Sequence, residues 1–429
     1  MSPRSIVLGY FAAVGLITTC LTGIATAQTF TVGVGQVQLD VPAGVDMWGY
    51  LPPRKSQGTL DPLMARIFVF GDGQSRAVLV TLDLGRTPNQ RQMDRARRMV
   101  RDRAGIQTVI FTASHTHSGP YLLDQYPDDR PPEWESRMIE AIAEGIIHAA
   151  ESAAPARLGS GRGWVQIGHN RRYVNPDGSV RMLWENPTRI STHPVDPEVL
   201  VLRIDDLEGR PRGLIVGYAC HPVVFGPDNA LYSADFPGAM SRYVSDRLDG
   251  SPVVAFVQGG CGDINPFMDK RRLEEDAREL MRRVGEELGR EALRVAEATP
   301  TLAPAAPSVQ SAIETLTLQD RRAEGTSYEA PVTVLLLNGR HAFVGLPGEP
   351  FVEFQLELKR RAGTETAFFL GYTNGYLRYF PTIRAAVEGG YGAAEMAMTE
   401  VGAGERLLRR GTVILYRMLG RLSESPETE

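Results

Sequence analysis

Short runs of β-branched and aromatic residues recur along the chain, and they predict buried β-strands. Turn-forming glycine, proline, asparagine and aspartate residues bound most of these runs. The predicted strands lie at residues 66–70, 77–82, 108–112, 198–204, 213–218, 252–257, 332–337, 342–346 and 366–370.

Amphipathic helical patterns alternate with these strands. One series of apolar residues steps by four positions along a single helix face, at Trp134, Met138, Ile142 and Ile146. A second series runs from Leu273 to Leu288 through a highly charged segment. Strands that alternate with helices are typical of an α/β protein. We therefore predict layered β-sheets flanked by helices, organised as a single catalytic domain over residues 28–420 with a flexible polar tail at 421–429.

The first 27 residues are expected to be a signal peptide. Arg4 precedes an apolar run over residues 6–24, and the run ends in the small residues Ala25 to Ala27. The alternative interpretation is a membrane anchor, but threonines and glycines interrupt the run. Cleavage would leave Gln28 as the first residue of an exported protein, periplasmic or extracellular. No later stretch is apolar and long enough to predict a transmembrane segment.

Composition narrows the class of protein. Hydrophobic residues make up 43% of the 429 residues and charged residues 23%, values that are typical of globular proteins. The net charge of −5 argues against a nucleic-acid partner, because no basic surface is available to neutralise phosphates. Three cysteines are too few for a disulfide scaffold. In an exported chain Cys220 and Cys261 could form a disulfide or remain buried free thiols, and the sequence leaves both open.

Two histidines follow the predicted strand at residues 108–112. They are His115 and His117, in the segment Ser114 to Pro120, where a glycine and a proline mark a turn. Neutral imidazole is the commonest protein ligand for zinc. The segment therefore indicates metal binding, against the alternative of two solvated loop histidines.

Two further loops carry polar residues after a strand. His221 follows the strand at residues 213–218 and is either a ligand or a hydrogen-bonded structural residue. The glycine-rich segment Gln258 to Pro266, with Asp263 and Asn265, follows the strand at residues 252–257. Its backbone N–H groups could form a nest for an oxyanion, or the segment could be a tight turn.

The last two loops offer oxygen ligands. Glu349 lies after the strand at residues 342–346, and Pro350 suits the first position of a helix, so Glu349 is expected to cap that helix or to bind a metal. Tyr376 lies in the glycine-rich turn after the strand at residues 366–370, where a tyrosine usually packs and only rarely binds zinc through its phenolate. Sites in α/β proteins gather at the carboxyl ends of strands. Two or three histidines with a carboxylate there have the composition of a catalytic zinc site.

The order of these motifs resembles the neutral/alkaline ceramidase family over most of the chain. The signature histidine segment at residues 112–120, Asn170-Arg171, Gly262 to Pro266 and Pro347 to Glu349 carry the resemblance most clearly. The other matching segments lie at residues 32–35, 47–50, 61–63, 82–83 and 374–376.

This resemblance implies a zinc amidase that cleaves the N-acyl bond of ceramide to sphingosine and a fatty acid. It implies zinc ligands at His115, His221, Glu349 and Tyr376. It also implies a supporting or proton-handling role for His117 and a substrate contact for Arg171. Two departures from the family pattern are expected to matter. Asn265 occupies the position of the family's serine, and the chain ends without the family's further immunoglobulin-like domain.

Because an amide cannot form an acyl-enzyme, either zinc-activated water is the nucleophile or this copy of the site is impaired. Asn265 and the glycine-rich backbone at residues 259–262 would donate hydrogen bonds to the developing oxyanion, and His117 would pass a proton to the leaving amine. Asp83, Asp235 and Asp263 are candidates either to orient a ligand histidine or to form turns.

Two alternative functions remain open at the sequence level. One is a zinc hydrolase of another ester or amide, and the other is a non-catalytic lipid- or sugar-binding homologue. The expected partner is a small-molecule or lipid substrate, with peripheral contact to membrane lipid.

Overall fold

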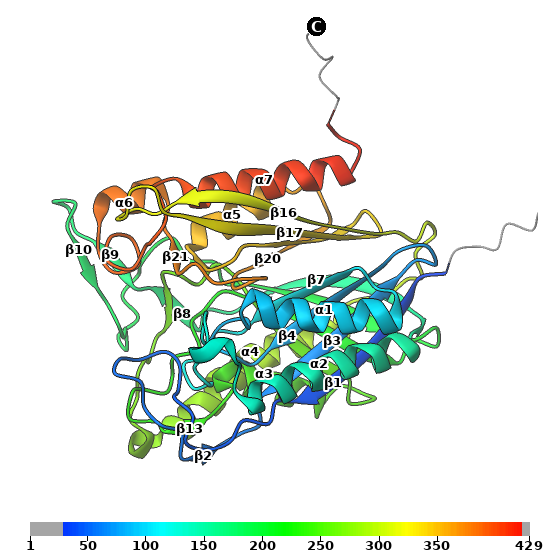
Figure 1. Ribbon diagram of the computed structural model, residues 1–429, viewed down its shortest axis with the longest axis horizontal. Coiled ribbons are helices and arrows are strands. Elements are labelled where there is room, and N and C mark those ends of the chain that lie inside the picture. The colour runs from blue at the N-terminus through cyan, green and yellow to red at the C-terminus, as the bar shows by residue number, and fades with distance from the viewer. Residues whose placement is uncertain (1–28, 423–429) are drawn as a thin grey trace, which may run out of the picture.

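A computed structural model describes residues 29–422. The predicted signal peptide at residues 1–27 and the end of the predicted tail, residues 423–429, lie outside the described residues. Three β-sheets form the centre of the molecule, and each carries helices on its outer face (Figure 1). The predicted α/β class is thereby confirmed. Within residues 29–422 no helix has the length and apolar character needed to cross a bilayer.

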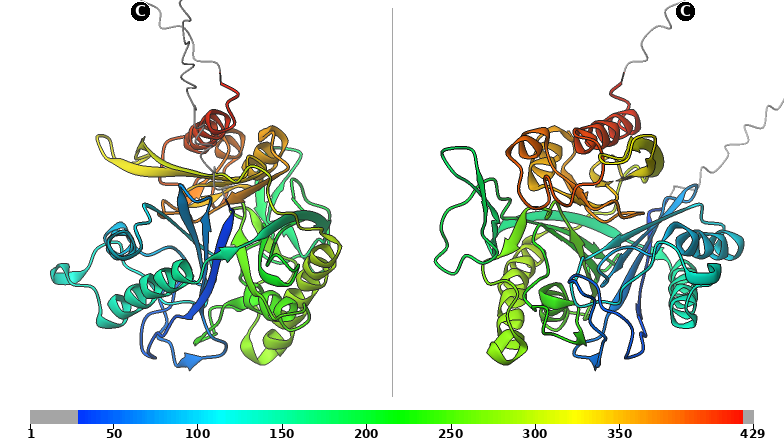
Figure 2. Two further views of the ribbon diagram at one scale, coloured as in Figure 1. Left: turned by 90° about the vertical axis from the view of Figure 1, so that its right-hand side faces the viewer. Right: turned by 60° about the vertical axis from the view of Figure 1, so that its left-hand side comes forward.

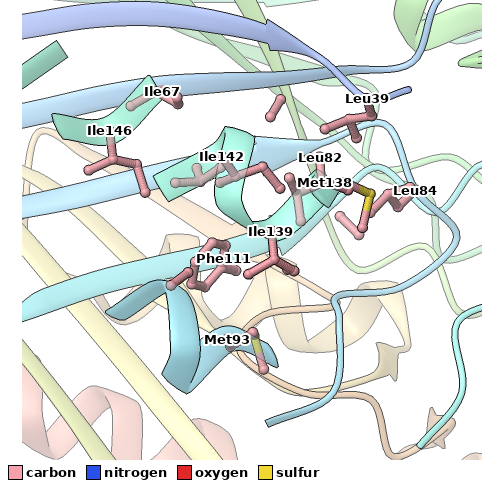
Figure 3. Packing of buried hydrophobic residues seen from close by; sticks show 14 of the residues in the cluster. Leu39, Ile67, Leu82, Leu84, Met93, Phe111, Met138, Ile139, Ile142 and Ile146 are labelled. Carbon is pink, nitrogen blue, oxygen red and sulfur yellow. The ribbon is translucent and has the colours of Figure 1, made fainter. Parts of the chain in front are cut away.

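The first sheet has the strand order β5-β4-β3-β1-β6 and is antiparallel except for the parallel pair β4–β5. Helices α1 (Gln90–Ala104) and α2 (Glu133–Glu151) cover its outer face. The predicted apolar stripe of α2 is confirmed, because Met138, Ile142 and Ile146 point to the sheet (Figure 3). The strands are β1 (Thr31–Gln38), β3 (Met64–Gly71), β4 (Arg76–Leu82), β5 (Thr108–Ala113) and β6 (Ala154–Pro155).

The second sheet has the order β14-β12-β11-β7, and its parallel pair is β12–β14. Helices α3 (Asp235–Ser245) and α4 (Arg278–Ala298) pack against it. The helical pattern predicted from Leu273 starts too early, because Asp276 has a φ of 57° and interrupts regular α-helix before Arg278. The strands are β7 (Arg157–Trp164), β11 (Glu198–Asp205), β12 (Pro211–Tyr218) and β14 (Val253–Gln258).

The third sheet has the order β16-β17-β18-β20, with a parallel pair β18–β20. Helices α5 (Val352–Arg361) and α7 (Ala403–Met418) lie on it, and the short helix α6 (Ile383–Glu388) lies beyond its end (Figure 1). The strands are β16 (Val309–Gln319), β17 (Ser327–Leu337), β18 (His341–Gly345) and β20 (Thr366–Leu370).

Four short strand pairs complete the description. They are β2 (Gly58–Thr59) with β13 (Leu231–Tyr232), β8 (Gly168–Asn170) with β15 (Ile264–Pro266), β9 (Arg172–Val174) with β10 (Val180–Met182), and β19 (Glu349–Pro350) with β21 (Tyr379–Phe380).

The three sheets meet along β5, β14 and β20, while their helices face three different sides of the molecule (Figure 2). Gln258 at the end of β14 joins all three, because its side chain donates to the Ser114 carbonyl at 3.0 Å and its own carbonyl accepts from Gly371 N–H at 2.9 Å. The inner faces form a central core that includes Phe68, Phe70, Leu202, Ile215, Leu335, Phe343 and Phe368. The loops that follow these three strands therefore open to one common region.

Asp235 opens helix α3 as a buried residue in the left-handed conformation, with a φ of 56°. Burial raises the pKa of its carboxyl group to about 7, because an ion is costly away from water. In an unfolded chain the pKa of aspartate is about 3.9. Protonated Asp235 therefore favours the folded state at low pH, and this contribution is lost as the pH rises through about 7.

We expect Asp235→Asn to stabilise the protein above about pH 7 by up to about 4 kcal/mol and to change little near about pH 4. Asparagine resembles the neutral acid and tolerates positive φ. Urea unfolding of both proteins across this pH range measures the difference. The control is Asp246→Asn, at the exposed aspartate just after the same helix, which should follow the wild-type pH dependence. A gain for Asp235→Asn that is constant with pH would contradict the prediction.

Candidate functional site

Loops from all three sheets place five of the predicted site residues together. His115 and His117 follow β5, and His221 follows β12. Glu349 follows β18, and Tyr376 follows β20. Each of these strands belongs to a parallel pair, so these loops leave the sheets at carboxyl ends of parallel strands, as the sequence predicted.

The side chains of these loops converge to hydrogen-bond distances. His115, His117 and His221 each offer a ring nitrogen, and these nitrogens lie within 4.8 Å of one another. Nε2 of His117 is 3.2 Å from Nε2 of His115. Oε2 of Glu349 is 3.2 Å from Nε2 of His221 and 3.5 Å from Nε2 of His115. The arrangement could hold a metal ion.

Backbone carbonyl groups orient the two histidines that face Glu349. Nδ1 of His115 lies 2.6 Å from the Gly85 carbonyl oxygen, and Nδ1 of His221 lies 2.6 Å from the Cys261 carbonyl oxygen. A carbonyl can only accept, so each Nδ1 carries the proton. The lone pair of each Nε2 is then directed to the site, which is the tautomer that a metal ligand needs.

Of the two roles considered for the three aspartates, orienting a ligand histidine is not the one observed. The Asp83 carboxylate pairs with Arg66 at 2.9 Å. Asp235 accepts from the Phe236 and Phe225 backbone, and Asp263 accepts from the Val352 N–H at 2.9 Å. The alternative of structural turns and helix contacts is the one that these hydrogen bonds support.

Backbone strain concentrates at the site. His115 has a φ of 70°, and Tyr372 and Asn374 have φ values of 51° and 55°. Non-glycine residues adopt this conformation at a cost, and such residues gather at functional sites. The Tyr372 ring stacks on the His115 ring with centroids 4.1 Å apart, which fixes the histidine from behind.

Burial and charge together set the protonation of the site. Burial lowers the pKa of His221 to about 4, and Arg171 contributes further. Burial also lowers the pKa of His117 well below its usual value, with His115 and His221 adding to the effect. For Glu349 burial acts to raise the pKa, but His115 and His221 bring it well below its usual value. At neutral pH the site therefore presents the neutral imidazoles of His117 and His221 beside the ionised carboxylate of Glu349.

Tyr376 contacts the carboxylate from its other side. Its hydroxyl donates to Oε1 of Glu349 at 2.5 Å, whereas Oε2 faces the histidines. Burial raises the pKa of the Tyr376 phenol well above its usual value, and Glu349 raises it further. The guanidinium of Arg86 lies 5.0 Å from the centre of the Tyr376 ring. Tyr376 thus holds Glu349 in place through a neutral hydroxyl.

The geometry around Glu349 corrects one local prediction. Pro350 does not open a helix, because Glu349 and Pro350 form the short strand β19 and helix α5 begins at Val352. The pairing of β19 with β21 aligns Glu349 with Tyr379. A strand pair rather than a helix cap therefore positions the carboxylate.

Arg171 is buried in a cage of aromatic rings. Its guanidinium carbon lies 5.3, 5.6 and 5.3 Å from the ring centres of Trp184, Tyr379 and Tyr391. The side chain donates to the Gly262 carbonyl at 2.6 Å and to the Tyr379 hydroxyl at 3.1 Å. Burial acts to lower the pKa of Arg171, but Tyr379 and Glu349 raise it above its usual value. Arg171 is therefore a permanent cation near the carboxylate of Glu349.

Asn265 does not offer the hydrogen bond that the sequence suggested for an oxyanion. Its side-chain oxygen accepts from Arg171 at 3.2 Å, and its side-chain nitrogen donates to Asp269 and to the Trp184 carbonyl. Both ends of the amide are therefore engaged. Asn265 acts as a bridge between a buried cation and a buried carboxylate.

The glycine-rich turn also lacks the expected nest of free N–H groups. Gly259 N–H donates to the Tyr218 carbonyl at 2.8 Å, and Gly260 N–H donates to the Gln355 side chain at 2.9 Å. Cys261 and Gly262 N–H groups donate to the carbonyls of Gly259 and Pro350. The alternative of a tight turn is thus the correct one. Its glycines permit close packing, since a Cβ on Gly262 would lie 2.5 Å from the Glu349 carbonyl oxygen.

Cys220 and Cys261 are buried free thiols, one of the two alternatives that the sequence left open. Burial raises the pKa of both thiols well above the usual value. Cys261 also lies 3.1 Å from the Tyr372 hydroxyl. We expect neither thiol to react with a disulfide reagent at neutral pH in the folded protein and both to react after unfolding in urea. A native protein in which either thiol reacts at the rate of an exposed cysteine would contradict this prediction.

Several residues beside the site were not identified from the sequence. They are Trp48, Tyr50 and Arg86 near the histidines, and Trp184, Asp269 and Lys270 near Arg171. Met47 to Tyr50 was noted only as a motif. Asp269 and Lys270 lie shortly after the glycine-rich segment, and this position in the chain was the available signal.

The chain is similar to known proteins in both sequence and fold. Residues 30–280 match the family model of neutral/alkaline non-lysosomal ceramidase, N-terminal. The chain is 28% identical to a neutral ceramidase of Mycobacterium tuberculosis over 254 residues, which cover 53% of this chain and 38% of that relative. It is also 28% identical to a neutral ceramidase of Pseudomonas aeruginosa over 249 residues, or 55% of this chain and 37% of that relative. In both cases the match spans less than two fifths of the relative's length.

The fold extends the similarity beyond the region that the family model matches. The crystal structure of the Pseudomonas aeruginosa neutral ceramidase superposes with a TM-score of 0.75 at 19% sequence identity, covering 93% of this chain and 76% of that one. A ceramidase complexed with C2 superposes with a TM-score of 0.76 at 17% identity, covering 94% and 77%. The similarity of fold thus continues past residue 280, where the family model ends.

Proposed function

The chain belongs to the neutral/alkaline non-lysosomal ceramidase family, and on that premise we propose that it is a zinc-dependent hydrolase of the N-acyl amide bond of ceramide or a related N-acyl lipid. The observation that carries this proposal is the convergence of His115, His221 and Glu349. Oε2 of Glu349 lies 3.2 Å from Nε2 of His221 and 3.5 Å from Nε2 of His115. The names of the relatives, neutral ceramidases, support the choice of substrate.

Zinc suits the donors that converge here. Two ligands at about 2.0–2.1 Å from a tetrahedral zinc ion lie roughly 3.3 Å apart. The separations of Glu349 from His221 and His115 are close to this value. Neutral imidazole nitrogens and a carboxylate oxygen are also donors that zinc accepts. The ring nitrogen of His117 and the hydroxyl oxygen of Tyr376 are two further atoms beside these three that could bind the metal.

Bound zinc would polarise an amide carbonyl and lower the pKa of water to about 7. The chain's own residues hold this chemistry in place. The carbonyl groups of Gly85 and Cys261 fix His115 and His221 in the ligand tautomer. The Tyr376 hydroxyl fixes Glu349.

His117 is the proposed proton carrier. It is neutral at pH 7, because burial and its neighbouring histidines lower its pKa, and it lies at the histidine cluster with Nε2 3.2 Å from His115. A neutral imidazole can take a proton and pass it to a leaving amine. Arg171 and Asp263 act as positioning residues, since Asp263 ties the glycine-rich turn to the first turn of α5.

Water is the proposed nucleophile, because the asparagine that replaces the family's serine cannot form an acyl-enzyme. The matched control for this point is Asn265→Ser. If hydrolysis in this protein needs no serine nucleophile, the Asn265→Ser variant should show no acyl-enzyme burst and no gain in rate.

The decisive experiment measures fatty-acid release from a short-chain ceramide by the zinc-loaded protein. Release that a chelator abolishes would support both hydrolysis of the amide bond and its dependence on zinc. Absence of release from a folded, zinc-containing protein would overturn ceramide as the substrate and favour the second candidate, a zinc hydrolase of another ester or amide. The engagement of Asn265 by Arg171 and Asp269 is the observation that favours this second candidate.

We further propose that the protein is exported after cleavage of residues 1–27 and meets its lipid substrate outside the cytoplasm. Amino-terminal sequencing of protein secreted or released from the producing cell tests this proposal. A mature chain that begins at Gln28 would support it, and retention of Met1 would contradict it.

A further inference from the structure

The two most exposed large hydrophobic side chains among residues 29–422 both lie on segments that border the candidate site. Val387 is 84% exposed and Leu51 is 82% exposed. A single exposed apolar residue is ordinary on a protein surface, but apolar residues that gather around one site mark an interaction surface. The place of each residue in the fold therefore decides what it indicates.

Leu51 belongs to the loop that carries Tyr50 against the histidines. The Tyr50 ring lies edge-on to His117 with centroids 5.2 Å apart, and its hydroxyl donates to the Phe225 carbonyl at 2.7 Å. Leu51 follows Tyr50 directly, so the Cα atoms of the two residues are about 3.8 Å apart. The anchored tyrosine thus holds Leu51 at the edge of the histidine cluster, with its side chain in solvent.

Val387 lies at another wall of the site, in helix α6. This helix lies between Tyr379 and Tyr391, whose ring centres are 5.6 and 5.3 Å from the guanidinium carbon of Arg171. Four residues span at most about 14 Å, so the Cα atom of Val387 lies within that distance of the Cα atom of Tyr391. Ile383, also exposed, lies four positions before Val387 and shares its helix face. Helix α6 therefore presents an apolar face beside the Arg171 cage.

The β9–β10 hairpin packs against the end of this helix. Arg172 in β9 donates to the Gly389 carbonyl at 2.9 Å and pairs with Glu388 at 3.2 Å. A Cβ on Gly390 would lie 2.9 Å from the Val180 side chain in β10. The hairpin, α6 and the loop that precedes β2 lie on the same side of the molecule, at the left of Figure 1, and the right-hand view of Figure 2 brings this side forward. These three segments therefore belong to one surface, which we call the docking surface.

The docking surface carries an excess of positive charge in an acidic protein. Its segments, residues 46–57, 172–182 and 378–390, contain six basic and three acidic residues, whereas the whole chain contains 46 basic and 51 acidic residues. Among the basic residues Arg181 and Arg384 are exposed. Exposed apolar side chains flanked by arginines suit an anionic lipid surface, because the apolar groups enter the headgroup layer and the cations are attracted to the lipid phosphates.

We propose that the docking surface binds an anionic lipid bilayer, with Leu51 and Val387 inserted among the headgroups and Arg181 and Arg384 against the lipid phosphates. The choice of a lipid surface rests on the proposed N-acyl lipid substrate, which resides in bilayers. Docking in this orientation turns the walls of the site to the bilayer, so a lipid can enter the site without crossing water. A second copy of this chain is the other occupant that the experiment must distinguish.

Co-sedimentation of the zinc-loaded protein with vesicles tests this inference. The vesicles contain phosphatidylcholine with or without phosphatidylglycerol, and neither lipid has an amide bond to hydrolyse. We expect the protein to bind the mixed vesicles more tightly, and this difference to shrink at high salt. Leu51→Ser and Val387→Ser should each lower the partition coefficient roughly 10-fold, because each removes one inserted apolar side chain. The double variant should lower it about 100-fold, since the two sites lie in different segments.

The matched control is Leu207→Ser. Leu207 is 51% exposed in the turn between β11 and β12, at the opposite end of β12 from His221. Its replacement should leave vesicle binding at the wild-type level. Because the replaced side chains lie in solvent, all three variants should fold, and thermal unfolding checks this. Loss of binding in Leu207→Ser equal to that in Val387→Ser would contradict a localised docking surface.

Hydrolysis distinguishes this inference from the proposed function. The double variant should lose more of its rate on ceramide in mixed vesicles than on dissolved short-chain ceramide. If no ceramide is cleaved in either form, the proposed function fails, but vesicle binding that depends on Leu51 and Val387 still supports docking.

Two results would overturn the inference. One is a wild-type protein that binds neither kind of vesicle, and the other is a double variant that binds the mixed vesicles as tightly as wild type does. Size-exclusion chromatography without vesicles identifies the other occupant. A wild-type dimer that the double variant loses, together with absence of vesicle binding, would assign the docking surface to a second copy of this chain.

Discussion

Replacing His115 with asparagine should remove bound zinc and lower amide hydrolysis by roughly 10³-fold or more. The imidazole of His115 faces Glu349 at 3.5 Å and His117 at 3.2 Å, so it contacts both sides of the proposed metal position. Asparagine is too short to reach the position of Nε2. It is also the substitution that best tolerates the φ of 70° at this residue, so the backbone of the loop should persist.

The measurements are zinc content per protein molecule and fatty-acid release under the same conditions. The matched control is His148→Asn, at an exposed histidine in the last turn of α2, which should keep wild-type zinc and rate. Thermal unfolding without metal should show that the His115→Asn protein is folded. A His115→Asn protein that retains one zinc ion and full activity would exclude His115 as a ligand.

The sequence predicted the parts of the fold whose causes are local. Each predicted strand overlaps an observed one, because a strand buried on both faces needs a continuous apolar run, and β20 is buried throughout. Strand β16 was missed because its residues alternate between partly buried and exposed positions. Strand β7 was missed because glycine and arginine interrupt it and hide the pattern.

The site was predictable in outline for a similar reason. Carboxyl ends of parallel strands collect functional loops, and this rule located His115, His221, Glu349 and Tyr376 correctly as neighbours. The errors concern hydrogen bonds between distant parts of the chain. The Asn265 side-chain oxygen accepts a hydrogen bond from Arg171, which lies 94 residues earlier. The N–H of Gly260 donates to the side chain of Gln355, which lies 95 residues later. No local pattern carries that information.

The sequence also could not distinguish the orienting groups of the histidines. Aspartates are frequent partners of ligand histidines, which made Asp83, Asp235 and Asp263 reasonable candidates. Backbone carbonyls serve equally well, and every residue has one. Which carbonyl faces an imidazole is decided by the packing of the loops, as it is for Gly85 and Cys261.

Replacing Arg171 with methionine should lower the free energy of unfolding by about 3–5 kcal/mol. Three acceptors would lose their donor, on Asn265, Gly262 and Tyr379. The buried carboxylate of Glu349, which raises the pKa of Arg171, would also lose this neighbouring cation. Methionine fills similar volume, so the loss should reflect charge and hydrogen bonds rather than a cavity.

Urea unfolding of the full chain measures this loss, and two variants define its origin. Arg171→Lys keeps the charge but not the planar fork, so its loss should lie between wild type and Arg171→Met. Arg181→Met removes an exposed arginine that also lies over an aromatic ring, at 5.1 Å from Tyr173, and should change stability by less than about 0.5 kcal/mol. Equal losses for Arg171→Met and Arg181→Met would show that the aromatic contact, not the buried hydrogen-bond network, is what Arg171 contributes.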